Sequence, residues 1–430
     1  MWEKITQLFR VPELRKRILF TLGAIIVFRL GTHIAVPGVD PTALKNFFSG
    51  GQSGGILDFL NMFTGGALQR FSLFALGVTP YINASIIFSL LTAVVPKLKE
   101  MQEQGREGRR KITAYTRWAT LVLAVIQAGT ISALVISWGL TKGGIWFYIV
   151  SIVSLTTGTL FLMWLGERMT ENGIGNGISM LIMIGILSRF PSQLQAMFNS
   201  ISAGSVSPLW AIVFVAMLVV VIAAMTMVQQ GQRKILIQYA KRTSGRRTYG
   251  GHTSHLPIRV NQGGVIPIIF ASALLTLPIT LTQWLPALQG IYAYIKEGSL
   301  AYILAYVLLI FFFTFFYSSI VFDPEDVAKN VREAGGFVPG VRPGKPTSEY
   351  ISGVLSRILL LGAVFLAAIA VLPYLLSAVS GLTSMFFIGG TSLLIVVGVG
   401  IDTLMQIEAH LVMRHYESLT KAGGLLGRRR

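Results

Sequence analysis

Few residues of this chain are of the types that carry out catalysis, and none of them stands in a catalytic spacing. The 430 residues include no cysteine and only five histidines, which excludes thiolate chemistry and cysteine-ligated metals. No His-Glu-x-x-His zinc motif and no Gly-x-Ser-x-Gly nucleophile elbow occurs. GVRPGKPT at 340–347 resembles a phosphate-binding loop, but it has the wrong spacing and Pro346 where Ser or Thr would bind magnesium. We therefore expect no enzyme, no cofactor and no metal site.

Ionisable side chains within the apolar stretches are also few. Arg29 lies near the end of the first apolar stretch, and Asp402 and Glu408 lie near the end of the last. Ion-coupled transporters place such groups in the middle of the membrane, whereas side chains near helix ends reach the interface. A small-solute secondary transporter is therefore kept only as the alternative function.

The composition indicates a polytopic membrane protein. Hydrophobic residues make up 53% of the chain and charged residues 13%, and the mean hydropathy is +0.66. Soluble domains are about 25% charged. The segment Met1–Arg17 is basic and is followed by a full-length apolar stretch, so we expect no cleavable signal peptide.

Apolar windows long enough to cross a bilayer occur ten times. The fifth is short and interrupted by glycine. The windows are 18–34, 72–95, 117–138, 145–165, 177–190, 209–228, 264–285, 301–322, 352–376 and 385–405.

Lysine and arginine are distributed unevenly between the two sides of these spans. The N-terminus, the loops 96–113, 229–262 and 323–350, and the C-terminal tail carry most of them, and the alternate loops carry few. Because cytoplasmic loops are enriched in positive charge, we expect both termini to be cytoplasmic. Five spans followed by five spans give two halves of opposite orientation, the layout of an inverted repeat with a pathway at its interface. We place these halves at 1–200 and 201–430.

A shorter apolar stretch, Gly54–Phe71, fits none of the ten spans. It is bounded by Gly54–Gly55 and Gly65–Gly66 and contains Asp58 and Asn61. The residues between the glycine pairs would make a helix of about 15 Å, roughly half of a bilayer core. We expect a half-helix that enters the membrane region without crossing it. From the residues alone, a static interfacial helix explains the pattern as well as a moving one.

Several longer stretches together resemble the SecY family, the channel subunits of the bacterial general secretory translocase. The resemblance covers essentially the whole chain, in family order. The stretches that carry it are LGVTPYINASIIFSLL at 76–91, NGIGNGISMLIMIGI at 172–186, GQRKILIQYAKRTSGRRTYGGHTSHLPIRVNQGGVIPIIFAS at 231–272, FDPEDVAKNVREAGGFVPGVRPGKPTSEYI at 322–351 and GGTSLLIVVGVGIDTLMQIEAHL at 389–411.

The resemblance implies an all-α polytopic fold of ten transmembrane helices in two inverted five-helix halves, with a re-entrant plug half-helix at about 55–70. It implies a passive channel in the bacterial cytoplasmic (inner) membrane that conducts unfolded preproteins. Transmembrane segments would leave sideways through a lateral gate of spans two, three, seven and eight. The implied partners are the membrane subunits SecE and SecG, the SecA motor ATPase, the ribosome with its rRNA and exit proteins, preproteins, and lipid including anionic phospholipid.

The resemblance also assigns roles to individual residues. A narrow ring of branched apolar side chains excludes ions because it cannot hydrate them. The implied pore ring is Val78, Ile82, Ile182, Ile186, Ile269 and, beside the family position at Gly400, Ile401. The implied plug includes Leu57, Asp58, Leu60, Asn61 and Phe63.

At the lateral gate the resemblance implies Asn83 and Leu277, with Ser89 and Gln127 along the same seam. Hydrogen bonding between helices explains Ser89 and Gln127 equally well. Two cytoplasmic loops, about 229–262 and 323–350, are implied to dock the motor or ribosome, and their cations would neutralise RNA phosphates. Attraction to anionic lipid is the other explanation of this charge. The docking residues are Lys241, Arg242, Arg246, Arg247, Arg342 and Lys345.

Overall fold

The computed structural model describes residues 11–39, 44, 61, 64–141, 144–204, 207–239, 241–244, 247–250, 253–282, 299–380 and 391–426. By its internal contacts the chain divides into two compact units, which we treat separately. The first unit comprises Met1–Val206 and Ile395–Arg430, and the second comprises Ser207–Leu394.

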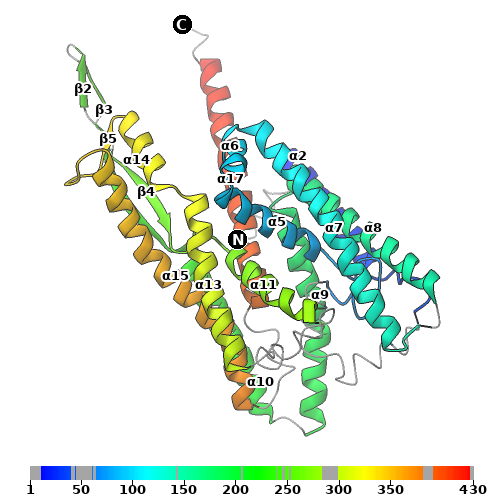
Figure 1. Ribbon diagram of the computed structural model, residues 1–430. Coiled ribbons are helices and arrows are strands. Elements are labelled where there is room, and N and C mark those ends of the chain that lie inside the picture. The colour runs from blue at the N-terminus through cyan, green and yellow to red at the C-terminus, as the bar shows by residue number, and fades with distance from the viewer. Residues whose placement is uncertain are drawn as a thin grey trace. The chain divides into compact units, whose positions relative to one another are not determined.

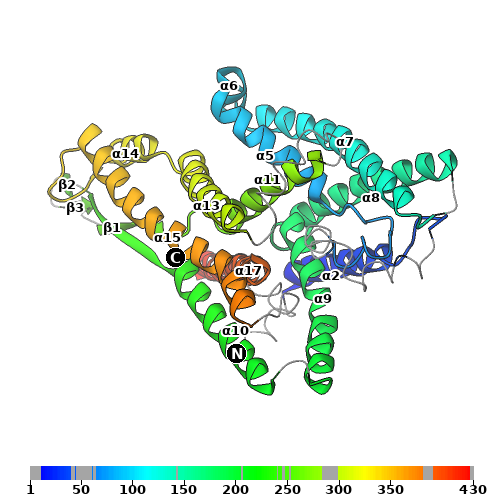
Figure 2. The ribbon, with the colours of Figure 1, turned by 60° about the horizontal axis from the view of Figure 1, so that its bottom comes forward.

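The described part of the first unit consists mainly of long helices (Figures 1 and 2). Helix α5 packs on α7, α7 on α8, and α8 on both α9 and α2. Helix α17 begins just before the boundary between the units and lies almost entirely in the first. The helices are α2 (Pro12–Gly31), α5 (Thr79–Val94), α6 (Pro96–Glu103), α7 (Arg106–Ser137), α8 (Ile145–Asn172), α9 (Gly177–Ser202) and α17 (Thr391–Leu426).

Local sequence explains where several of these helices begin and bend. Asn176 caps α9, because its side-chain oxygen accepts hydrogen bonds from the N–H groups of Ile178 and Ser179. Pro96 follows the end of α5, and the chain bends there by 99° into α6, since the residue before a proline disfavours helix. The fifth apolar window was expected to end at 190. Helix α9 instead continues through Pro191 to Ser202.

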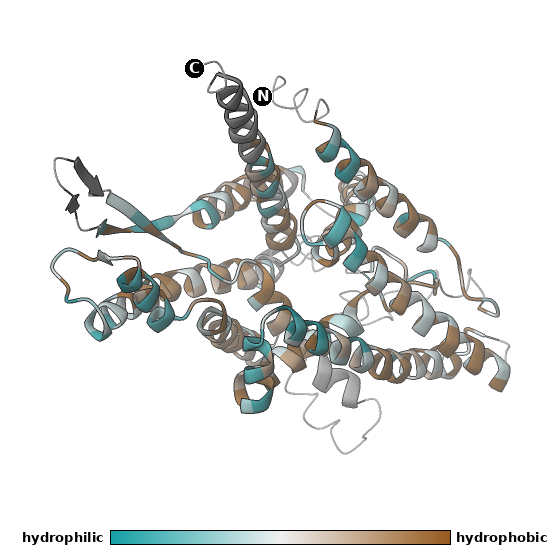
Figure 3. Cartoon of the chain, turned by 90° about the horizontal axis from the view of Figure 1, so that it is seen from above, coloured by the Kyte–Doolittle hydropathy of each residue, from teal (hydrophilic) through white to brown (hydrophobic). Residues whose placement is uncertain are grey.

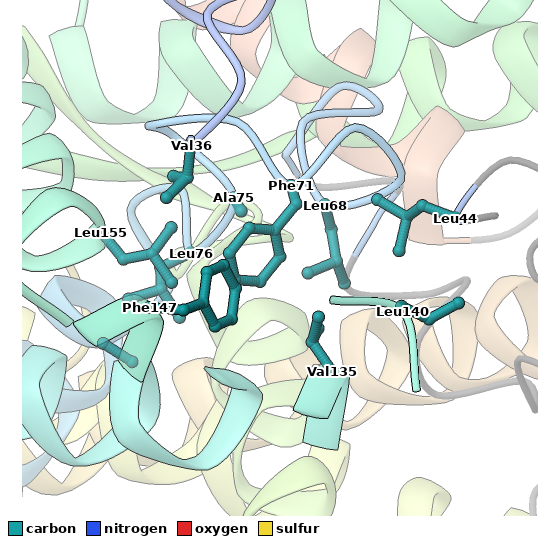
Figure 4. Packing of buried hydrophobic residues seen from close by; sticks show 11 residues of the cluster. Val36, Leu44, Leu68, Phe71, Ala75, Leu76, Val135, Leu140, Phe147 and Leu155 are labelled. Atoms are coloured by element: carbon teal, nitrogen blue, oxygen red, sulfur yellow. The ribbon is translucent and has the colours of Figure 1, made fainter. Parts of the chain in front are cut away.

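A compact turn of residues 64–77, here called the inner turn, fills the space between α2, α8 and α9. Its backbone bonds to the segment after α2, where Val36 N donates to Phe71 O at 2.9 Å and Leu73 N donates to Ile34 O at 2.9 Å. Phe71 adopts a left-handed backbone with φ of 43°, which is strained for a bulky residue. It is held there by burial and by contact with the ring of Phe147, 5.9 Å away (Figure 4).

In the described part of the second unit, five helices are combined with a three-stranded and a two-stranded antiparallel sheet. Helix α13 packs between α11 and α15, α14 packs on α15, and the sheet has the strand order β4-β1-β5. The sequence analysis did not predict these strands. The helices are α10 (Pro208–Gln230), α11 (Ile266–Thr282), α13 (Leu300–Val321), α14 (Pro324–Glu333) and α15 (Lys345–Ser380). The strands are β1 (Gln232–Tyr239), β2 (Lys241–Ser244), β3 (Arg247–Gly250), β4 (Thr253–Arg259) and β5 (Gly336–Phe337).

Within the described residues, six helices are long and apolar enough to cross a membrane, or seven if the bent pair α5 and α6 counts as one span. Shorter apolar helices occupy Val215–Gln230 and Ile266–Leu275. Hydropathy follows the same plan, with apolar helix bodies and hydrophilic residues along α6 and α14 (Figure 3). The protein is therefore a multi-pass membrane protein, while the count of ten spans stays a prediction.

Candidate functional site

The first two candidate pore residues lie at the start of α5. Val78 immediately precedes the helix, is 6% exposed, and its carbonyl accepts the N–H of Ile82 at 3.0 Å. Ile82 is half-buried. Gly77 has a φ of 57°, and a Cβ placed on it would lie 3.0 Å from Cγ2 of Thr64. Thr64 and Gly77, at the two ends of the inner turn, are therefore in close contact directly before Val78.

The inner turn also contacts α9, which carries the next two candidates. A Cβ on Gly65 would lie 2.9 Å from Ser188 Oγ and 3.1 Å from Gly185 Cα. The Ser188 hydroxyl donates to Gly65 O at 3.5 Å and to Gly185 O at 2.7 Å. Ile186, 7% exposed, lies between these two contact residues, and Ile182, 2% exposed, lies one helical turn before it.

Helix α17 contacts the start of α9 and carries a fifth candidate. The Thr403 hydroxyl donates to the Met180 sulfur at 3.7 Å, and Gly175 N donates to Gln406 Oε1 at 3.0 Å. Ile401 lies two residues before Thr403 and is 8% exposed. The structure thus joins α5, the inner turn, α9 and α17 into one contact network that carries five of the six candidates.

The sixth candidate, Ile269, lies on α11 in the second unit and is 8% exposed. Burial by itself suits a sealed ring and ordinary packing equally well. Gly400, the alternative to Ile401, has open space where a side chain would stand. Membership of the ring therefore remains a proposal for all six residues.

Of the five plug candidates, only Asn61 lies within the described residues, and it is fully buried. Its Oδ1 accepts the N–H of Gln69 at 3.0 Å, and its carbonyl accepts the Gly66 N–H at 3.0 Å and the Thr64 hydroxyl at 3.2 Å. Asn61 therefore stabilises the N-terminal half of the inner turn through these three hydrogen bonds. The remaining plug candidates, Leu57, Asp58, Leu60 and Phe63, lie outside the described residues.

Two gate candidates lie on α5, which packs on α7, where Gln127 is found. Asn83 is 3% exposed, and no hydrogen-bond partner of its Oδ1 is found among the described residues. A buried polar atom normally has a partner, so this oxygen is an exception among the described side chains. Ser89 and Gln127 are half-buried. Leu277 lies on α11, where its side chain is outside the described residues.

The first docking loop is a β-ribbon rather than an irregular loop. Strands β1 and β4 pair from Gln232↔Arg259 to Gln238↔Thr253, and β2 and β3 extend the ribbon, with Ser244 opposite Arg247. In Figure 1 the β2–β3 hairpin forms the far end of this projection. Lys241 and Arg242 lie on β2, and Arg246 is outside the described residues.

The ribbon is anchored by one apolar face. Ile235, Ile237 and Ile258 are at most 5% exposed, and Ile235 and Ile258 pack against Ile351 and Leu355 of α15. The short run of aliphatic residues Ile235, Leu236 and Ile237 between polar residues in RKILIQY at 233–239 was the signal that could have predicted a strand here. The sequence analysis considered only the charges of this loop.

The second docking loop joins the first through the sheet. Strand β5 pairs with β1, with Gln238 opposite Phe337 and Tyr239 opposite Gly336. Beyond β5, Arg342 and Lys345 are exposed, and the buried Thr347 donates its hydroxyl to Arg342 O at 2.8 Å. Two loops that lie about ninety residues apart therefore form a single surface, which spacing along the sequence did not reveal.

Among the residues that the structure describes, no group of three or more His, Cys, Asp or Glu side chains is arranged to hold a metal ion. The described contacts that join α5, the inner turn, α9 and α17 are made by glycines, by the hydroxyl groups of Ser188 and Thr403, and by the amide groups of Asn61 and Gln406.

Comparison with known proteins identifies relatives of the whole chain. The SecY family profile matches residues 72–404. The protein translocase subunit SecY of Thermotoga maritima is 46% identical over the full length of both chains, and that of Haemophilus influenzae is 44% identical over 96% of each. A solved protein-conducting channel superposes with a TM-score of 0.67 at 17% identity, over 95% of this chain and 97% of its own. The fold is therefore that of these channels.

Proposed function

This chain belongs to the SecY family of protein translocase subunits, and from that premise we propose that the inner turn and the helices around it form its pore seal. In this proposal the protein is a passive channel for unfolded preproteins, and Val78, Ile82, Ile182, Ile186, Ile269 and Ile401 line its waist. The plug of about 55–70 blocks this constriction of the pore from the outer side.

One observation supports the proposal most directly: the inner turn, which follows the proposed plug segment, contacts both α5 and α9. Asn61 closes the inner turn, Gly77 joins it to the start of α5, and Gly65 lies against α9. A plug built on this turn would be tethered at its C-terminal end beside Val78 and Ile186. The plug could then move out of the pore while its C-terminal end stays attached beside the pore.

The seal works because of what its side chains lack. Branched apolar groups offer no oxygen or nitrogen to replace the hydration shell of an ion, so a narrow ring of them dewets. The same groups make no directional bonds and can yield around a passing chain. Asn83 of α5, whose amide oxygen has no partner among the described residues, supports a lateral gate along α5 and α7.

Energy and partners would come from outside the chain. We assign docking of a SecA motor ATPase or a ribosome to the joined surface of the β-ribbon and the loop of Arg342 and Lys345. A neighbouring solved structure is Sec61 in a canine ribosome–channel complex, with a TM-score of 0.63 at 16% identity. The proposed membrane partners are SecE and SecG, in a bacterial inner membrane with both termini cytoplasmic.

Site-specific crosslinking tests the channel. The chain has no cysteine, so Ile82→Cys and Ile186→Cys each carry a single thiol for attaching a photocrosslinker. We expect both to crosslink to a secretory chain stalled during transport. Val153→Cys, at a side chain of α8 that is 59% exposed, is the matched control and should crosslink to lipid. Lipid adducts at all three positions, with none to the secretory chain, would refute the pore assignment.

A further inference from the structure

A cavity of about 580 Å³ lies in the second unit, between the N-terminal parts of α14 and α15. This volume falls within the ~300–1,000 Å³ typical of ligand pockets. Five of its seven lining residues lie within the candidate docking loop 323–350, but none of them is one of the candidate docking residues. It is lined by Asp323, Pro324, Glu325, Ser348, Glu349, Ser352 and Gly353.

The cavity is acidic in a chain whose net charge is +18. Three of its lining residues carry carboxylates, and none is a lysine or arginine. Asp323 has a local role, because its Oδ1 accepts the Glu325 N–H at 2.9 Å and caps α14. Glu325 lies in the first turn of that helix, where negative charge is favoured. Glu349 lies beyond the first turn of α15, so the helix dipole does not explain it.

Ser348 independently points to a ligand. It lines the cavity although it is only 8% exposed. Its backbone N–H donates to Gly344 O at 3.2 Å, but no hydrogen bond of its hydroxyl is found within the described part of the chain. Because Ser348 lines the cavity, its hydroxyl is available to bond a group that enters it.

The charges and spacing select one class of ligand. No set of three acidic or histidine side chains in the described ranges is close enough together to hold a metal ion. Carboxylates repel nucleic-acid phosphates. Separated carboxylates and a hydroxyl instead suit the several N–H donors of a guanidinium or ammonium group. We propose that this cavity receives an arginine or lysine side chain of a protein that docks on this face.

The position of the cavity gives it a role in choosing partners. It adjoins the loop that exposes Arg342 and Lys345, so one short surface offers cations and an anionic pocket. Juxtaposed like charges suppress wrong partners and complementary charges fix register. A protein with both signs of charge would match this surface, and RNA would match only the cationic part. This inference rests on the proposed function only in taking this face as the one that partners approach.

Peptide binding tests the cavity in the full-length protein, reconstituted in nanodiscs of phosphatidylcholine. The probe is a fluorescent peptide with two arginines, and its Kd is measured by anisotropy. Glu325→Gln with Glu349→Gln should weaken binding about tenfold, because hydrogen bonds to charged groups are lost. Glu333→Gln, on the same helix but outside the cavity, should bind as the unmodified protein does.

A second variant separates the effect of the carboxylate charges from the effect of the free volume of the cavity. A Cβ on Gly353 would meet nothing within 4 Å, so Gly353→Gln fills the cavity without altering its charge and should also weaken binding about tenfold. Equal affinity of all four proteins, or binding of Mg²⁺ or RNA in place of the peptide, would overturn the proposal. The assay uses no secretory chain, so its failure leaves the crosslinking test of the pore untouched.

Discussion

The inner turn and the β-ribbon are the two main non-helical segments that the structure describes, and they are stabilised by different kinds of contact. The turn lies among helices and touches them through backbone and glycine. The ribbon projects from its unit and is anchored by side chains on one face only. The two segments therefore have different tolerances to substitution, and the difference separates the roles proposed for them.

Close backbone approach fixes the inner turn. A Cβ on Gly158 of α8 would collide with the carbonyl of Leu73. The ring of Phe74 stacks between Phe28 of α2 and Phe161 of α8, at centroid distances of 6.1 and 5.9 Å. Where α8 meets the turn at Gly158 there is therefore no room for an added methyl group, since protein interiors are close-packed.

The ribbon depends instead on the few apolar side chains that face α15. The outer faces of β1 and β4 carry exposed residues, which take no part in that packing, and the sequence of the tip is rich in charge. Charges can therefore vary at the tip without changing the fold. This is what a docking element requires, whereas a seal requires the opposite.

The largest effect is expected at the anchor of the ribbon. Ile258 is fully buried against α15, and Ile258→Ala should destabilise the ribbon by about 2–5 kcal/mol, the usual cost of such a cavity. Hydrogen–deuterium exchange over 232–239 should become faster. Leu236→Ala is the control, because Leu236 is 38% exposed on the opposite face of β1. Equal exchange in the two variants would contradict the one-sided anchor.

A smaller effect is expected at the inner turn. Gly158→Ala should lower stability by about 1–3 kcal/mol, because the added methyl group displaces Leu73. Gly23→Ala in α2 is the matched change, with no atom within 4 Å of the new methyl group, and should be neutral or slightly stabilising. Thermal unfolding in detergent measures both variants, and ion leakage in liposomes should rise only for Gly158→Ala. Identical melting temperatures would disprove the close contact.

The helices were predictable where hydrophobicity alone determines them. The windows 117–138 and 145–165 correspond to α7 and α8, which are long and apolar. The end of α9 was not predictable from its window, because Pro191 and the polar residues after it suggested a stop. The strands were missed because β1 and β4 are only eight and seven residues long and contain few apolar residues, next to a run of charges.

The candidate site was predictable only as a set of residues, without its geometry. The motifs pointed to Val78 and Ile186, but nothing in their spacing showed that Gly65 and Gly77 connect them. Asn61 was expected in a water-filled funnel as part of the plug. Its contact with Gln69 gives it a structural part in the turn that sequence reasoning could not see.

The smallest effect on stability is expected at the ribbon tip, and there the effect on binding should dominate. Arg247 pairs with Ser244 across β3 and β2, so Arg247→Ala keeps the strands and should change unfolding by no more than about 0.5 kcal/mol. If the Arg247 side chain neutralises a phosphate of ribosomal RNA, its removal should lower the magnitude of the slope of log K against log salt by about one, where K is the ribosome-binding constant. Thr248→Ala, at the neighbouring position, should leave that slope unchanged. Ribosome binding measured across a salt series tests whether the tip binds RNA. A slope that is unaltered by Arg247→Ala would mean that this charge contacts lipid or protein and no RNA phosphate.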